Sequence, residues 1–282
     1  MTKRPVRRPP RSGPARSSPP PGRRDRARTL GGEQVEGRQA VRELLLAGRR
    51  RVREVWIASD LDDAGVIADI VDLASQQRIP VVEVSRRKLD AQARSEAPQG
   101  VLAKAAPLGE ADLDDLARPA KGAPAPFLVA VDGVTDPGNL GALLRSADGA
   151  GATGVLVPKH RAVHVTPTVA KAAAGAIEYL PIAVVSGLPA ALQRAKQLGC
   201  WIVGLDDAAD RSLFDLDELG REPVVLVLGA EGAGLSRLVR QRCDVLVAIP
   251  MRGRLSSLNV SAAATLACYE VARQRAPSVH GH

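Results

Sequence analysis

The stretch VVLVLGAEGAGL, residues 224–235, is an unbroken apolar run that ends in a loop with three glycines around one acidic residue, Glu231. An apolar run without polar alternation is typical of a strand that is buried on both faces of a parallel sheet. In such sheets, ligands bind at the carboxyl ends of the strands. The stretch therefore predicts an α/β fold and places a candidate site in the loop that begins at Gly229.

Strand and helix patterns alternate, with short connections, from Phe127 to the last helix. Predicted strands cover Phe127–Asp132, Gly154–Val157, Tyr179–Val184, Trp201–Leu205, Pro223–Leu228 and Asp244–Ala248. Predicted helices cover Gly138–Ala150, Pro167–Ala176, Leu188–Leu198, Ser236–Gln241 and Ser257–Gln274. This alternation predicts a parallel sheet with helices on both faces.

A smaller α/β unit is predicted upstream, at residues 30–105, from helices at 37–47, 62–77 and 85–93 and strands at 52–58, 80–84 and 100–105. Residues 106–126 contain four prolines and little periodicity, which favours a linker. The chain is therefore divided into a basic tail at 1–29, the small unit, the linker, a large unit at 127–277 and a short tail at 278–282.

Positive charge is concentrated at the N-terminus. Residues 1–28 hold ten of the 39 Lys and Arg residues but one of the 31 acidic residues, so the rest of the chain is close to neutral. A segment rich in Pro and Arg cannot bury enough apolar surface to fold. It either contacts a phosphate-bearing partner or serves as a solubilising extension. Aromatic residues make up 2% of the chain, which argues against RNA recognition on aromatic stacking surfaces.

The three cysteines, Cys200, Cys243 and Cys268, are widely separated, and the four histidines form no metal-ligand spacing with them. This pattern predicts neither a disulfide framework nor a metal site. The sequence also contains no apolar run of the length that a membrane span or a secretory signal needs. We therefore expect a cytoplasmic protein without a metal and without a membrane partner.

The first candidate loop, VDGVTDPGNLG at 131–141, follows a predicted strand and opens a helix. Asp136 or Asn139 is placed to cap that helix, and Pro137 suits its first turn. Arg145 lies further along the helix, where its side chain can reach a phosphate or a ribose. A capped helix with a solvated arginine is the alternative interpretation.

The second candidate loop is the glycine loop at 229–235. Its acidic residue, Glu231, is placed to hold a cationic group such as Arg145. The glycine spacing differs from G-x-G-x-x-G, which disfavours dinucleotide binding. A plain turn from strand to helix is the alternative.

The third candidate loop, VAIPMRGRLSSLNVS at 247–261, connects the last predicted strand to the last helix. Ser257 is placed to cap that helix, whose free N–H groups would then offer an anion or ribose site. Capping without any ligand is the alternative.

Taken together and in this order, the three loops resemble the SpoU (TrmH-type) family of RNA ribose 2'-O-methyltransferases. The matching text is DPGNLGALLRSADGAG at 136–151, VLGAEGAGL at 227–235 and IPMRGRLSSLNVSAAATLACYE at 249–270. The small unit, through GRQAVRELL and QGVLAKA, is similar to the RNA-binding domain that often precedes the catalytic domain in this family, although Pro98 stands where many relatives have a histidine. The Gly-Ala-Glu-Gly form of the second loop resembles the 23S rRNA guanosine branch more than the tRNA branch.

The resemblance implies a parallel sheet with a C-terminal trefoil knot, a homodimer, and S-adenosyl-L-methionine as the cofactor. It implies a cofactor pocket at Leu228, Gly229, Ile249, Met251, Ser257 and Leu258. It implies a catalytic group of Asn139, Arg145, Glu231, Ser257 and Asn259.

The implied reaction is methyl transfer to a ribose 2'-hydroxyl of RNA, with 23S rRNA as the expected partner. Guanidinium groups keep their proton in proteins, so our hypothesis is that Arg145 stabilises the developing alkoxide and is oriented by Glu231 and Asn139. A tRNA ribose as acceptor, and a non-catalytic RNA-binding role in ribosome assembly, remain as alternatives. The missing dinucleotide fingerprint disfavours an oxidoreductase.

Overall fold

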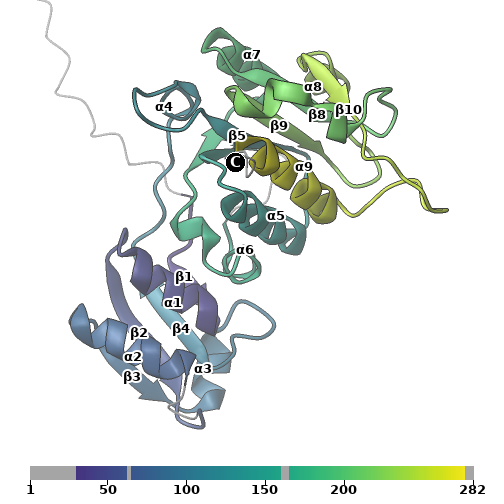
Figure 1. Cartoon of the computed structure of the whole chain (residues 1–282). Coiled ribbons are helices and arrows are strands. Elements are labelled where there is room, and N and C mark those ends of the chain that lie inside the picture. The colour runs from purple at the N-terminus through teal and green to yellow at the C-terminus, as the bar shows by residue number, and fades with distance from the viewer. Residues whose placement is uncertain (1–29, 62–64, 160–164, 277–282) are drawn as a thin grey trace, which may run out of the picture.

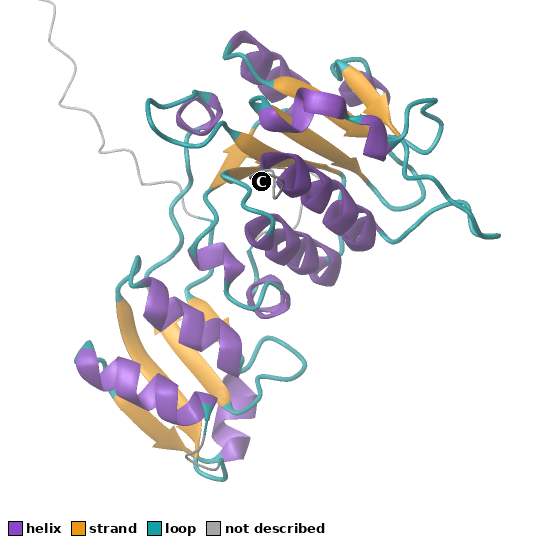
Figure 2. Cartoon of the chain, viewed as in Figure 1, coloured by secondary structure: helices purple, strands orange, loops and turns teal. Residues whose placement is uncertain are grey.

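The computed structural model describes residues 30–61, 65–159 and 165–276, which form two sheets with their own helices (Figures 1 and 2). The predicted tails at 1–29 and 278–282, the start of the helix predicted from Asp62, and two of the histidines, His160 and His164, lie outside the described residues. In the part of the chain that is described, no helix is long and apolar enough to cross a membrane.

The larger sheet has six strands in the order β10-β8-β9-β5-β6-β7, and every neighbouring pair is parallel. The strands are β5 (Phe127–Asp132), β6 (Gly154–Pro158), β7 (Ile182–Val185), β8 (Trp201–Leu205), β9 (Val224–Gly229) and β10 (Val245–Val247). The predicted parallel sheet is thus confirmed. Its central strand β9, the stretch quoted first, is buried from Val224 to Leu228, as a strand covered on both faces must be.

Helices cover both faces of this sheet (Figure 1). One face packs against α5 (Pro137–Gly149), α6 (Pro167–Ala172), α9 (Val260–Arg275) and the 3-10 turns η1 (Ala176–Glu178) and η2 (Leu213–Asp215). The other face packs against α4 (Leu113–Ala117), α7 (Leu188–Gln197) and α8 (Arg237–Arg240). A further 3-10 turn, η3 (Asp217–Arg221), precedes β9. All six strands therefore end at the same edge, and the three candidate loops follow β5, β9 and β10 there.

The smaller sheet has the order β1-β4-β2-β3, with β2 and β3 parallel and β4 antiparallel to both β1 and β2. Its strands are β1 (Gln34–Glu36), β2 (Val52–Ala58), β3 (Val81–Val84) and β4 (Val101–Ala105). Helices α1 (Arg38–Ala47) and α2 (Val66–Gln76) cover one face, and α3 (Arg86–Gln92) covers part of the other. The sequence did not predict β1, because this strand is short and two of its three residues are polar.

Local hydrogen bonds and backbone angles explain where the observed elements differ from the predicted ones. The last helix begins at Val260 because Asn259, not Ser257, accepts the capping bond, from the Ser261 amide at 2.8 Å. Helix α6 ends at Ala172 because Ala174 and Gly175 adopt positive φ and reverse the chain before η1. Strand β7 accordingly begins at Ile182 rather than Tyr179.

The segment predicted as a linker contains helix α4. Its Asp112 side chain caps the helix, and Asp114 accepts a hydrogen bond from Arg194 Nε of α7 at 2.8 Å. The alanine-rich, acidic stretch therefore packs on the large sheet, with Ala117 fully buried.

Gly141 allows α5 and α6 to pack closely, so we expect Gly141→Ala to destabilise the fold. A Cβ there would meet Ala172 Cβ, and would lie 2.8 Å from the Val169 carbonyl oxygen and 2.9 Å from the Ala173 nitrogen. Overpacking of about 1–3 kcal/mol should exceed the roughly 1 kcal/mol that alanine gains over glycine in a helix. Thermal unfolding measures the difference. The control is Gly149→Ala on the same helix, where the neighbour at 3.1 Å is the Tyr269 hydroxyl, the end of an exposed side chain. Equal melting temperatures for the two variants would contradict the prediction.

Candidate functional site

A cavity of about 280 Å³ opens at the carboxyl edge of the large sheet, between the loops that follow β8, β9 and β10 and the start of α9. All six residues predicted to bind a cofactor lie on its walls: Leu228, Gly229, Ile249, Met251, Ser257 and Leu258. Glu231 also lines it. The six residues that the family resemblance implied thus line one cavity, and they lie in the loops after β9 and β10 that the strand pattern had marked as candidates.

The glycine loop turns back on itself at the cavity wall. The Ala230 amide donates to the Gly234 carbonyl oxygen at 3.1 Å, and the Gly234 amide donates to the Ala230 carbonyl oxygen at 2.9 Å. A Cβ at Gly229 would meet the Gly234 backbone and lie 2.5 Å from the Leu235 nitrogen. Gly229 therefore lets two backbone segments touch, which any side chain would prevent.

Hydrogen bonds join the three candidate loops to one another. The Asn259 Nδ2 donates to Asn139 Oδ1 at 3.0 Å, and the Asn139 Nδ2 donates to Glu231 Oε2 at 3.5 Å. Asp136 caps α5 by accepting from the Asn139 amide at 2.6 Å, which fixes the backbone that carries Asn139. Three of the five residues predicted as catalytic are thus brought together, and Ser257 lies on the cavity wall beside them.

Arg145 stands apart from this group. It is exposed on α5, and it forms no ion pair or hydrogen bond with any residue that the structure describes. Because a helix turns about 100° per residue, the six positions between Asn139 and Arg145 place their side chains on different faces of α5. The predicted contact between Glu231 and Arg145 is therefore not made within this chain, and Glu231 accepts from Asn139 instead.

The loop after β8 also lines the cavity, through Leu205, Asp206 and Asp207, and it was not among the three predicted loops. The Asp206 carboxylate is nearly buried and pairs with Arg240 at 3.1 Å. The sequence did contain a signal for this loop, because two carboxylates directly follow Leu205, where a predicted strand ends. The rule that ligands collect at the carboxyl ends of parallel strands applies to this loop as well.

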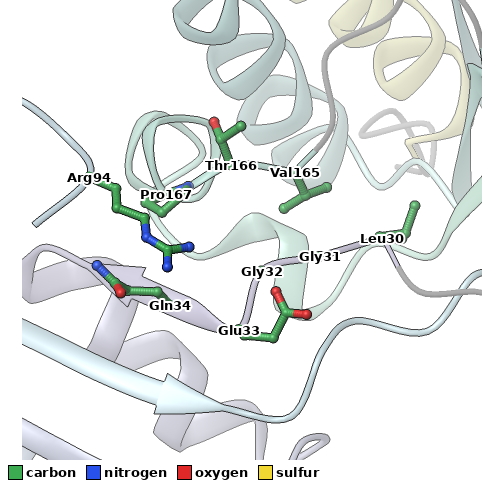
Figure 3. Close-up of a pocket in the computed structure, with 9 residues that line it drawn as sticks. All are labelled: Leu30, Gly31, Gly32, Glu33, Gln34, Arg94, Val165, Thr166 and Pro167. Atoms are coloured by element: carbon green, nitrogen blue, oxygen red, sulfur yellow. The ribbon is translucent and has the colours of Figure 1, made fainter. Parts of the chain in front are cut away.

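A second cavity, of about 350 Å³, lies between the small unit and the start of α6 in the large unit (Figure 3). Leu30–Gln34 and Arg94 form its small-unit side, and Val165, Thr166 and Pro167 form the other. The loop that carries Arg94 is held by the buried Glu36 carboxylate, which accepts from the Arg94 amide at 2.7 Å and the Ser95 amide at 2.9 Å. The cavity thus has walls from both sheet units.

Comparisons with known proteins agree with this geometry. The model of the SpoU rRNA Methylase family matches residues 126–269, and the model of the RNA 2'-O ribose methyltransferase substrate binding domain matches residues 34–111. The chain is 44% identical to the 23S rRNA (guanosine-2'-O-)-methyltransferase RlmB of Pseudomonas aeruginosa, over 87% of this chain and 98% of that protein.

Solved structures give the same result. The SpoU methyltransferase AviRb from Streptomyces viridochromogenes, in complex with AdoMet, superimposes with a TM-score of 0.70 and 30% identity, over 86% of this chain and 89% of that one. An AdoMet-bound rRNA methyltransferase from Sinorhizobium meliloti has a TM-score of 0.69 and 26% identity, over 86% of this chain and 88% of that one. Because family models match both units and the chain is 44% identical to a relative over 87% of its length, this protein belongs to the SpoU rRNA methylase family.

Proposed function

We propose that this protein transfers a methyl group from S-adenosylmethionine to a ribose 2'-hydroxyl of RNA, and that the acceptor is a guanosine of 23S rRNA. The observation that carries the proposal is the cavity at the carboxyl edge, whose walls contain every residue expected at the cofactor pocket. The guanosine acceptor is supported by the name of the Pseudomonas aeruginosa relative, which is similar over nearly its whole length.

The residues of the cavity fit this cofactor. Leu228, Ile249 and Leu258 offer apolar surface to a flat purine, while the exposed Asp207 brings a carboxylate that suits ribose hydroxyls and positive charge. At the wall, Gly229 lets the Gly234 backbone pack against the end of β9, and a side chain there would force this part of the wall apart. When bound, the cofactor supplies an electrophilic methyl group on a sulfonium.

The polar cluster of Asn139, Asn259 and Glu231 is placed to position the ribose. Glu231 accepts from the side-chain amide of Asn139, and Asn139 accepts from the side-chain amide of Asn259. These hydrogen bonds hold the three side chains in one orientation before the substrate binds. Ser257, on the wall, offers a hydroxyl that can donate to or accept from the ribose. Arg145 stabilises the negative charge that develops on the 2'-oxygen and holds the adjacent phosphate.

We further propose that the protein is a homodimer. Arg145 has no partner among the described residues of its own chain, and the outer face of α9 exposes Leu266 and Tyr269. A second copy packed on this face would cover apolar surface and would place Arg145 beside another chain.

The proposed division of labour follows the two family models: residues 30–105 bind RNA, and residues 127–277 carry out methyl transfer in the cytoplasm. We also propose that the C-terminal segment is threaded as a trefoil knot. The connection between β8 and β9 contacts the last segment at two places, through Ala248 with Arg211 and Leu213, and through Gln274 with Gly220. An experimental chain trace through 206–276 tests the threading.

The reaction is tested by tritium transfer from labelled S-adenosylmethionine to 23S rRNA and, separately, to tRNA. We expect labelling of rRNA at one guanosine ribose. Gly229→Ala should weaken cofactor binding roughly tenfold or more, about 1.4 kcal/mol, because the new methyl group forces the glycine loop open. Calorimetry measures the affinity.

The matched control is Gly253→Ala in the third loop, where a Cβ would meet nothing within 4 Å. If the methyl group is transferred to tRNA and not to 23S rRNA, the proposed rRNA acceptor is wrong and tRNA is the substrate. A protein that binds RNA but neither binds S-adenosylmethionine nor transfers a methyl group would favour the non-catalytic role in ribosome assembly.

The role of Arg145 is tested by the pH dependence of the rate in the wild type, Arg145→Ala and Arg145→Lys. If the guanidinium acts by its charge, Arg145→Ala should lose about 100-fold or more in kcat, as for the loss of an oxyanion-stabilising donor. Arg145→Lys should recover part of the rate with an unshifted profile. A fully active lysine variant whose rate follows titration of an amine would instead show a proton-accepting role.

The side from which Arg145 acts is tested by mixing two inactive variants, Arg145→Ala and Asn259→Ala. If the arginine serves the site of its dimer mate, a mixed dimer contains one intact site, and equal exchange should restore about a quarter of the wild-type rate. If both residues serve the same chain's site, every site in the mixture lacks one of them and no activity returns. Sedimentation of each variant verifies that it still forms dimers.

A further inference from the structure

Arg50 and Glu178 form a buried ion pair between the two sheet units. Arg50 lies between α1 and β2 of the small unit, and Glu178 ends η1 of the large unit. Arg50 Nε donates to Glu178 Oε2 at 2.9 Å, and a second guanidinium nitrogen donates to Oε1 at 2.5 Å. The side chains are 5% and 1% exposed, so the pair is removed from water on both sides.

The remaining guanidinium nitrogen binds the two segments through which the small unit joins the rest of the chain. It donates to the Gly32 carbonyl oxygen, just before β1, and to the Ala106 carbonyl oxygen, just after β4, at 2.8 Å each. One side chain therefore ties a carboxylate of the large unit to both the entry and the exit of the small unit.

The surface around the ion pair is closely fitted. Arg49 donates to the Tyr179 carbonyl oxygen at 2.9 Å, and the Tyr179 hydroxyl donates to Glu43 of α1 at 2.8 Å. At Gly175, whose φ is +93°, the place of a Cβ is taken by the Glu43 side chain. The two units thus meet on a specific surface that extends beyond a single contact.

The burial of the pair makes it sensitive to geometry. Taking both charges out of water is costly, and the cost is offset when the guanidinium and the carboxylate keep well-aligned hydrogen bonds. Burial raises the pKa of the Glu178 carboxyl, while the hydrogen bond and the charge of Arg50 oppose that rise. Units joined by a linker move relative to each other unless their interface holds them, and this pair is satisfied in one relative position.

We propose that Arg50 and Glu178 are positioning residues. They hold the small unit, which binds RNA in the proposed function, at a fixed place relative to the cavity at the carboxyl edge of the large sheet. This inference rests on the proposed function, since it assumes that RNA bound by the small unit must reach that cavity. The junction cavity beside Arg94 depends on the same arrangement, because its walls come from both units (Figure 3).

The test compares full-length wild type with Glu178→Gln, Arg50→Lys and the charge-free double variant Arg50→Met with Glu178→Met. Small-angle scattering reports the arrangement of the units, and steady-state kinetics on an rRNA fragment report KM and kcat. We expect a larger radius of gyration and a KM raised roughly tenfold, with kcat and cofactor affinity within about twofold of wild type. Arg50→Lys should not rescue, because an ammonium cannot reproduce the fork that binds the carboxylate and both carbonyls.

The control is Asp114→Asn, which removes an arginine–carboxylate pair between α4 and α7, away from the junction, and should leave scattering and KM unchanged. The double variant leaves no unpaired buried charge, so it is expected to fold even if the single variants do not. Wild-type scattering and wild-type KM in the double variant would overturn the inference, as would altered scattering with an unchanged KM. If the wild type itself transfers no methyl group, the proposed function fails, while scattering still reports whether the pair holds the units together.

Discussion

The parallel pairing of β9 with β5 and β8 is the constraint on which the rest of the structure depends. It runs over Phe127–Asp132 on one side and Trp201–Gly204 on the other, and it brings the ends of these strands to one edge. The loops that follow must therefore lie side by side, however far apart they are in the sequence. The Asp132 carboxylate, which accepts from the Ser236 amide at 2.7 Å, shows the result directly: the end of one strand holds the loop that follows the next.

The sequence predicted the large sheet well because its strands are apolar throughout. Strand β5 and strand β8 match their predicted bounds, and β9 differs by one residue at each end. Prediction was poorest where a single hydrogen bond decides an element. Ser257 and Asn259 are both good helix caps, and the helix starts after Asn259 because its side chain accepts from the Ser261 amide. Strand β1 forms because β4 offers it a partner, which its three residues do not reveal.

The candidate site was predictable as a set of loops but not as a set of contacts. The strand pattern predicted loops that share one edge, which follows from parallel pairing. The resemblance to the SpoU family supplied the six pocket residues, Leu228, Gly229, Ile249, Met251, Ser257 and Leu258, and all six line the cavity. Which polar groups touch is decided by loop conformation, so Glu231 was assigned to Arg145 when its neighbour is Asn139. The roles of these residues in binding and catalysis stay predictions.

The edge strand β10 is three residues long, and the third loop and α9 follow from it. Short edge elements open locally far more readily than a buried centre such as β9. A molecule held between the loops after β8, β9 and β10 binds when β10 is paired in the sheet and not when β10 has locally unfolded. A higher concentration of that molecule therefore favours the paired state by mass action. If this cavity holds the methyl donor, as we propose, the local stability of the β10 edge is coupled to the supply of that donor.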